Sequence, residues 1–144
     1  MLVMGILAAT AIPQYAGMLN HYRVEAAAAH LTADLAWARR HARQTSTNQP
    51  VNFTLPSQYV MPGMSDPDHP SLGFAEDFTQ SHPGVSILSA NFDGNTTLTF
   101  DIYGRPQTGS PLAPLAANGV VQIGAGSETR TVTVNAVTGQ VSSP

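Results

Sequence analysis

The apolar and polar positions of the first fifty residues divide into two zones. From Met1 to Ile12 the chain is apolar apart from Thr10. Over residues 14–45 it becomes polar, and apolar residues recur at alternating steps of four and three, the repeat of one helical face. These residues are Val24, Ala28, Leu31, Leu35, Ala38 and Ala42. The pattern predicts one long helix, apolar at its start and amphipathic afterwards, whose stripe packs against a sheet.

The apolar period changes to two after residue 48. Val51, Phe53 and Leu55 alternate with polar residues, as in a half-buried strand. Residues 85–92 and 96–103 have the pattern of two strands, and the Asp93-Gly94-Asn95 segment between them favours a tight hairpin. Shorter apolar alternations follow towards the C-terminus, separated by polar turns and without a crossover helix. This succession indicates an antiparallel sheet with one face on the helix.

Residues 62–83 are rich in Pro, Gly, Asp and Ser and predict a long loop. We therefore predict an α+β fold in which a long N-terminal helix packs on an antiparallel β-sheet. The helix takes residues 1–47, apolar over 1–12 and amphipathic over 14–45, and a globular β domain takes residues 48–144. A chain of 144 residues is long enough for one such domain.

Charge and composition exclude several classes of function. The chain has nine acidic residues, six arginines and no lysine, so no broad basic face is expected for nucleic acid. It has no cysteine, which removes disulfides, thiol nucleophiles and cysteine metal sites. No nucleophile elbow, phosphate loop or zinc helix motif is present. We predict neither a catalytic residue nor a cofactor.

The apolar opening fits three interpretations. A membrane helix needs about 20 apolar residues, and this run is shorter, so it cannot cross a bilayer unaided as it stands. Ala9-Thr10-Ala11 has the form of a signal-peptidase site, but no basic residue precedes Leu2. A buried core helix is the third interpretation. Pro13 either kinks the helix or opens a new one.

The run Gly5-Ile6-Leu7-Ala8-Ala9-Thr10-Ala11-Ile12-Pro13-Gln14-Tyr15 resembles the membrane helix of type IV pilins and of the pilin-like subunits of type II secretion. In that family the mature chain starts several residues earlier, with a methylated aromatic residue and a nearby glutamate that follow a basic leader. We therefore expect the natural chain to extend upstream of Met1. The resemblance and the small residues, which let helices approach closely, predict filament packing through this helix. The residues expected to make that packing are Leu2, Val3, Gly5, Ile6, Ala8, Ala9, Ile12 and Pro13.

A second resemblance lies towards the C-terminus. The segments at residues 98–106, 132–134 and 138–141, together with the alanine- and arginine-rich residues 36–42, are similar to the H-type pseudopilin and minor pilin domain (GspH/FimT). This resemblance implies a non-catalytic minor pilin or pseudopilin, placed near the tip of a type IV pilus or a type II secretion pseudopilus. Other pilin or pseudopilin subunits are its implied partners.

The same family resemblance implies a location. The subunit would be anchored in the inner membrane by a single pass, with a periplasmic globular domain, and would become extracellular in a pilus. Some members bind DNA through a basic motif after the last glycine, but residues 139–144 contain no arginine. DNA-binding in natural transformation therefore stays an alternative without an assigned residue from the family.

The polar residues offer two further candidates. Arg39, Arg40 and Arg43 could contact an anion or DNA, although cations near a helix C-terminus also offset the helix dipole, which we favour. His21 with Glu25, and His30 with Asp34, are spaced to pair on the helix surface. Two ligands without a third make a poor metal site, so no metal is predicted there. The Asp66-Pro67-Asp68-His69 segment is interpreted as a turn, with a metal site as the alternative.

Overall fold

A single long helix organises the molecule. The computed structural model describes the backbone of residues 2–144 and the side chains of residues 15–144. Helix α1 runs from Leu2 to Thr45 without a break, so the interpretation of Pro13 as the opening of a new helix is wrong. The helix ends where Ser46 takes a left-handed backbone conformation (φ 51°) and the Thr47 N–H donates to the Ala42 carbonyl at 3.2 Å. That turn sends the chain back into the first strand.

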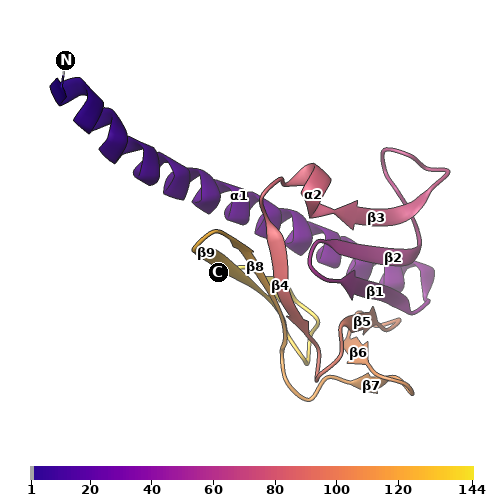
Figure 1. Ribbon diagram of the computed structural model, residues 1–144. Helices are drawn as coiled ribbons and strands as arrows, with labels where there is room; N and C mark the ends of the chain where they lie inside the picture. The colour runs from indigo at the N-terminus through magenta and orange to yellow at the C-terminus, as the bar shows by residue number, and fades with distance from the viewer. Residues whose placement is uncertain (1) are drawn as a thin grey trace.

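The strands form two antiparallel sheets and not the single sheet expected from the sequence. The six-stranded sheet has the order β3-β2-β1-β5-β6-β7, and the four-stranded sheet has the order β10-β9-β8-β4. The first comprises β1 (Gln49–Thr54), β2 (Gln58–Ser65), β3 (Gly73–Asp77), β5 (Thr97–Phe100), β6 (Pro106–Thr108) and β7 (Ala113–Pro114). The second comprises β4 (Ser86–Asn91), β8 (Gly119–Ala125), β9 (Glu128–Val134) and β10 (Val141–Ser142). Both lie on the same side of α1, over its C-terminal half, and the N-terminal part of the helix projects beyond them (Figure 1).

The predicted hairpin between residues 85–92 and 96–103 is wrong, although its turn exists. Asp93 and Gly94 both have positive φ (52° and 88°), as a tight turn requires, and Phe92 and Asn95 exchange backbone hydrogen bonds of 2.9 and 3.1 Å. Beyond that bridge the strands separate. β4 pairs with β8, whereas β5 pairs with β1, so the turn carries the chain from one sheet to the other.

The predicted loop over residues 62–83 is also wrong. Strand β2 continues to Ser65, and the chain returns as β3, which pairs with β2. A short helix, α2 (Phe78–Ser81), follows and is capped by the Asp77 side chain, which accepts from the Thr79 N–H at 2.9 Å. Hydrogen bonds from the side chains of Thr79 and Gln58 lower the pKa of Asp77 to about 2. The glycine and proline residues of this segment interrupt the alternation of apolar and polar residues, so the sequence pattern does not indicate the β2–β3 pair.

The core lies between α1 and the two sheets. Phe53 of β1 packs against Phe92, which follows β4, with ring centroids 5.6 Å apart. Phe53 also packs on Tyr59 of β2 at the same centroid distance. A side chain at Gly119 of β8 would overlap the Phe92 ring, so the glycine leaves the space that this ring fills. These rings join the two sheets into one core.

Candidate functional site

The first candidate site is the face of α1 that points away from the sheets. The six residues of the predicted stripe, Val24, Ala28, Leu31, Leu35, Ala38 and Ala42, are at most 2% exposed and lie against the sheets. A second apolar stripe runs along the opposite face with steps of three and four, and all its members are exposed. It consists of Tyr15, Met18, Tyr22, Ala26, Ala29 and Ala33. The helix is therefore apolar on two opposite faces, and the sheets cover only one of them.

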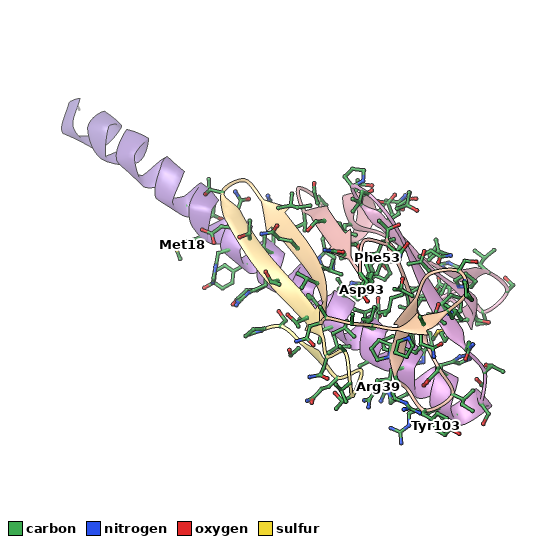
Figure 2. The ribbon with its side chains drawn as sticks, turned by 90° about the horizontal axis from the view of Figure 1, so that it is seen from below. Met18, Arg39, Phe53, Asp93 and Tyr103 are labelled. Atoms are coloured by element: carbon green, nitrogen blue, oxygen red, sulfur yellow. The ribbon has the colours of Figure 1, made fainter. Side chains whose placement is uncertain are left out.

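The large residues of this outward stripe gather at its N-terminal end. Tyr15, Met18 and Tyr22 are 66%, 58% and 62% exposed, and Figure 2 shows Met18 near the projecting part of the helix. Sequence reasoning missed the outward stripe because alanine fits an exposed helical surface as well as a packed one. The sequence did offer one signal for this stripe: alanines recur at steps of three and four with no charged residue between them.

The side chains expected to pack in a filament lie outside the described side chains. Only the helical backbone is described at Leu2, Val3, Gly5, Ile6, Ala8, Ala9, Ile12 and Pro13. Among the residues whose side chains are described, no helix is both long and apolar enough to span a membrane. The role of the apolar residues 1–12 in filament packing and membrane anchoring therefore stays a prediction.

The three arginines at the end of α1 do not form one open site. Arg39 is half-buried, and its Nε donates to the Gly104 carbonyl at 3.1 Å. Gly104 and Gly139 both have positive φ (81° and 74°), and a side chain at Gly139 would overlap the Gly104 carbonyl oxygen. Arg39 thus fastens the loop at Gly104 to the helix. Arg40 and Arg43 are exposed and line a shallow depression with Gln44.

An exposed aromatic lies at the same end of the molecule as Arg39 (Figure 2). Tyr103 is 65% exposed, and the Arg105 guanidinium lies over its ring, 5.0 Å from the centroid. The Arg105 Nε is 3.6 Å from an Asp101 carboxylate oxygen, so part of its charge is offset. Four of the six arginines therefore lie on or next to the end of α1 and the loop after β5.

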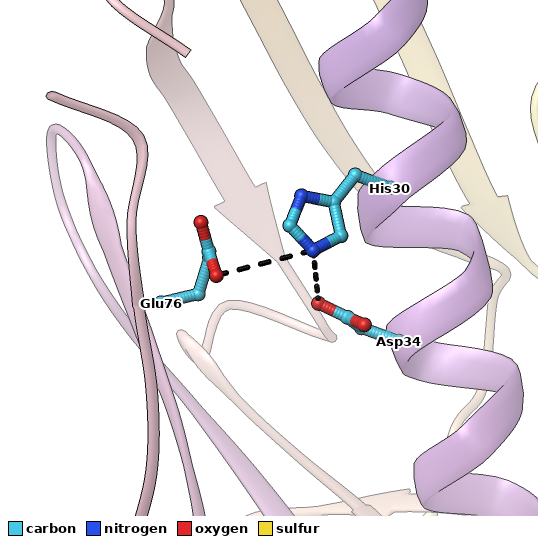
Figure 3. Close-up of side chains that lie close together, drawn as sticks. All are labelled: His30, Asp34 and Glu76. Carbon is cyan, nitrogen blue, oxygen red and sulfur yellow. Dashed lines mark ion pairs between the residues drawn. The ribbon is translucent and has the colours of Figure 1, made fainter. Parts of the chain in front are cut away.

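The second candidate site is a cluster of histidine and carboxylate side chains between α1 and β3. His30 and Asp34 pair as their spacing predicts, with His30 Nε2 3.3 Å from Asp34 Oδ2. Glu76 of β3 joins them, its Oε2 3.9 Å from the same nitrogen (Figure 3). The ligand atoms of the three residues all lie within 4.8 Å of one another. Glu76, the third side chain, which the sequence analysis did not find, comes from a segment predicted to be a loop.

Each member of this cluster is held by another side chain. His30 Nδ1 is 2.9 Å from His82 Nε2, and the Tyr59 hydroxyl donates to Asp34 Oδ2 at 2.6 Å. The Ser81 hydroxyl donates to Glu76 Oε1, which leaves Oε2 facing His30. Burial raises the pKa of Asp34, against the effect of the Tyr59 hydrogen bond, and burial lowers the pKa of His82. The pKa of the Tyr59 hydroxyl is raised, first by burial and then by the Asp34 charge.

The other predicted pairs are more exposed. His21 lies 3.7 Å from Glu25 and 3.5 Å from Glu128, but the Arg130 guanidinium also pairs with Glu25. The Asp66-Pro67-Asp68-His69 segment forms a turn in which the Asp68 N–H donates to Asp66 Oδ1 at 2.8 Å and the His69 N–H donates to the Asp66 carbonyl at 3.2 Å. Within residues 15–144, neither place brings ligand atoms of three such side chains within 4.8 Å of one another.

Comparison with known proteins establishes the fold. No family model and no curated protein matches the chain. Two crystal structures of the type IV minor pilin FimU from Pseudomonas aeruginosa (strain PAO1) are similar to it. The first, in space group P65, has a TM-score of 0.58 and 16% identity over 83% of this chain and 91% of that one. The second, in space group P21, has a TM-score of 0.61 and 15% identity over 84% and 87%. The expected pilin-like fold is confirmed, and the H-type (GspH/FimT) assignment stays a prediction.

Proposed function

We propose that this chain is a non-catalytic minor pilin or pseudopilin subunit that joins a type IV pilus or a type II secretion pseudopilus through its N-terminal helix. The observation that carries the proposal is the outward apolar stripe of α1, from Tyr15 to Ala33, which the sheets leave uncovered. Its partners are the helices of other pilin or pseudopilin subunits, and its place is near the filament tip. The likeness of the fold to a minor pilin supports this choice.

The chemistry of the stripe favours helices as neighbours. Exposed aromatic and methionine side chains at Tyr15, Met18 and Tyr22 lose contact with water when another helix covers them. Ala26, Ala29 and Ala33 are small enough to let a second helix backbone approach closely. A helix that is apolar on both sides is typical of one surrounded by protein. In this arrangement the apolar residues 1–12 anchor the subunit in the inner membrane before assembly, with the sheets in the periplasm.

The stripe gives the test of this proposal. Ala29→Glu and Ala33→Glu each place a charge on the outward face without touching the core, so the variants should fold and fail to enter filaments. The measurement is the amount of the chain in filaments sheared from cells that encode it, compared with its total amount. Val137→Glu, at a residue 77% exposed and far along the chain, is the matched control and should assemble normally. Normal incorporation of both helix variants would refute assembly through this face.

The chain lacks cysteine, which allows a second measurement on the assembled state. A single Ala33→Cys substitution should form cross-links to cysteines placed on the helix of a neighbouring subunit. The same cysteine should give no cross-link in cells that lack the other filament subunits.

DNA binding is the second candidate, favoured by the exposed Arg40 and Arg43 and by the Arg105–Tyr103 stack nearby. Arginine and an exposed aromatic are the groups that contact single-stranded nucleic acid. In a mobility-shift assay at low salt, an Arg40→Ala/Arg43→Ala double variant should then no longer shift DNA. The control Arg23→Ala, at an exposed arginine of the same helix, should keep most of the DNA binding. No shift with the unmodified chain would remove this candidate.

A further inference from the structure

We propose that His30, Asp34 and Glu76 form a binding site for a divalent transition-metal ion, with zinc as the best fit. The site joins the middle of α1 to β3, an outer strand of the six-stranded sheet (Figure 3). The inference is independent of the filament role, because the cluster lies between α1 and β3 and the outward stripe faces away from both sheets.

The donor atoms and their spacing suit zinc. An imidazole nitrogen and two carboxylate oxygens are ordinary zinc ligands, each about 2.0–2.2 Å from the ion in a tetrahedral site. Two ligand atoms at such distances lie about 3.4 Å apart. His30 Nε2 lies 3.3 Å from Asp34 Oδ2 and 3.9 Å from Glu76 Oε2, and the three ligand atoms all lie within 4.8 Å of one another. Small side-chain movements are enough to bring all three atoms to one ion, and water can take the fourth position.

Three further contacts orient the ligands as zinc sites require. A histidine ligand usually gives the proton of its other ring nitrogen to an acceptor, and a ligating carboxylate is itself hydrogen-bonded. Here His82 Nε2 faces His30 Nδ1, the Tyr59 hydroxyl donates to Asp34, and the Ser81 hydroxyl donates to Glu76. His82 and Ser81 come from α2 and its cap, which places this short helix behind the site.

The local charge also favours a cation. The Asp34 and Glu76 side chains are only 13% and 16% exposed, and two buried carboxylates in one place repel each other. Within residues 15–144, His30 is the only basic side chain with a nitrogen within 4.0 Å of a carboxylate oxygen of either residue. The comparable cluster at His21 differs, because the Arg130 guanidinium already pairs with Glu25 and would repel a metal ion.

A protonated His30 between the two carboxylates would account for the same distances without a metal, and titration with Zn²⁺ separates the two explanations. The full chain, purified in detergent micelles and freed of metal with a chelator, is titrated with ZnCl₂ by calorimetry. We expect saturable binding of about one ion per chain and a rise of several degrees in the unfolding temperature. Co²⁺ in place of Zn²⁺ should give the visible absorption of a tetrahedral site.

Four variants assign the binding. His30→Gln and Glu76→Gln should each abolish the saturable binding of zinc and the cobalt absorption. His82→Gln should weaken metal binding about 10–100-fold, because the His30 ring loses the contact that orients it. His21→Gln is the matched control and should leave binding unchanged. Circular dichroism of the metal-free variants verifies folding, and Glu76→Gln, which keeps the shape of the side chain, serves if His30→Gln does not fold. Absence of saturable binding to the parent chain, or unchanged binding in Glu76→Gln, would overturn the proposal.

Discussion

Single residues decide how the loops meet the helix, and Gly139 is the sharpest case. Its positive φ of 74° is a conformation that other residues adopt with strain, and a side chain there would overlap the Gly104 carbonyl oxygen. The same carbonyl accepts the hydrogen bond from Arg39. One missing side chain thus allows two loops and the helix to meet.

Gly139→Ala should therefore destabilise the protein. Backbone strain alone costs about 1–3 kcal/mol, and displacement of the Gly104 carbonyl adds to it. The change in the free energy of unfolding is measured by urea denaturation. Gly17→Ala is the control: Gly17 lies within α1 with nothing within 4 Å of an added Cβ, so this substitution should stabilise by about 0.5–1 kcal/mol. Equal effects of the two substitutions would contradict this account.

Tyr59 is the second residue that acts through a single contact. Its side chain is fully buried, and its hydroxyl donates to the largely buried Asp34 carboxylate at 2.6 Å. Tyr59→Phe keeps the ring but leaves that carboxylate without its donor, at a cost of about 1–3 kcal/mol in unfolding free energy. Tyr22→Phe, at an exposed ring, should change the stability little. A Tyr59→Phe variant as stable as the parent would show that water replaces the hydroxyl.

The elements differ in how well the sequence predicts them. The buried stripe of α1 was legible because large and small apolar residues repeat at the helical period over residues 24–42. Strand β1 was predictable for a similar reason, because its apolar residues alternate with polar ones at a period of two. The pairing partners of β4 and β5 were not predictable. The Asp93-Gly94 turn forms as expected, but tertiary packing places the two strands that it connects in different sheets. A turn determines a local direction and leaves the pairing of the strands open.

The candidate sites were predicted only as far as local spacing reaches. The pairing of His30 with Asp34 follows from their separation by four residues. Glu76 is distant from both residues in the sequence, and the prolines and glycines around its strand suggested a loop. The sequence therefore did not predict that Glu76 would lie beside His30 and Asp34. The tie between Arg39 and Gly104 is likewise a contact between distant segments. Where a function depends on such contacts, coordinates are needed to find it.

The two faces of α1 should respond differently to substitution. Leu35→Ala removes a fully buried side chain between helix and sheets and should lower the unfolding free energy by about 2–5 kcal/mol. Ala33→Leu, two positions away on the exposed face, adds apolar bulk outside the core and should shift it by less than about 0.5 kcal/mol. Thermal and urea unfolding of both variants measure the contrast. A large loss from Ala33→Leu would mean that the outward face is covered within the monomer.

At the scale of the whole molecule, a long helix carries two sheets that share one core but little backbone pairing. No strand of one sheet pairs with a strand of the other in the part of the chain that the structure describes. Side chains make part of their contact, as where the Phe53 and Phe92 rings pack with centroids 5.6 Å apart. The helix, covered on one face by both sheets, is the element that holds their relative position.

The joint between the sheets yields the last prediction. Gly119→Ala places a methyl group in the space of the fully buried Phe92 ring, and such overpacking should cost about 1–3 kcal/mol in unfolding free energy. Phe92→Leu alone should also destabilise, because it leaves part of the same space empty. In the double variant the smaller side chain accommodates the added methyl group, so its loss should be less than the sum of the two single losses by about 0.5–3 kcal/mol. Additive losses in this double-mutant cycle would mean that Gly119 and Phe92 do not share one packing site, and that the two sheets are joined elsewhere.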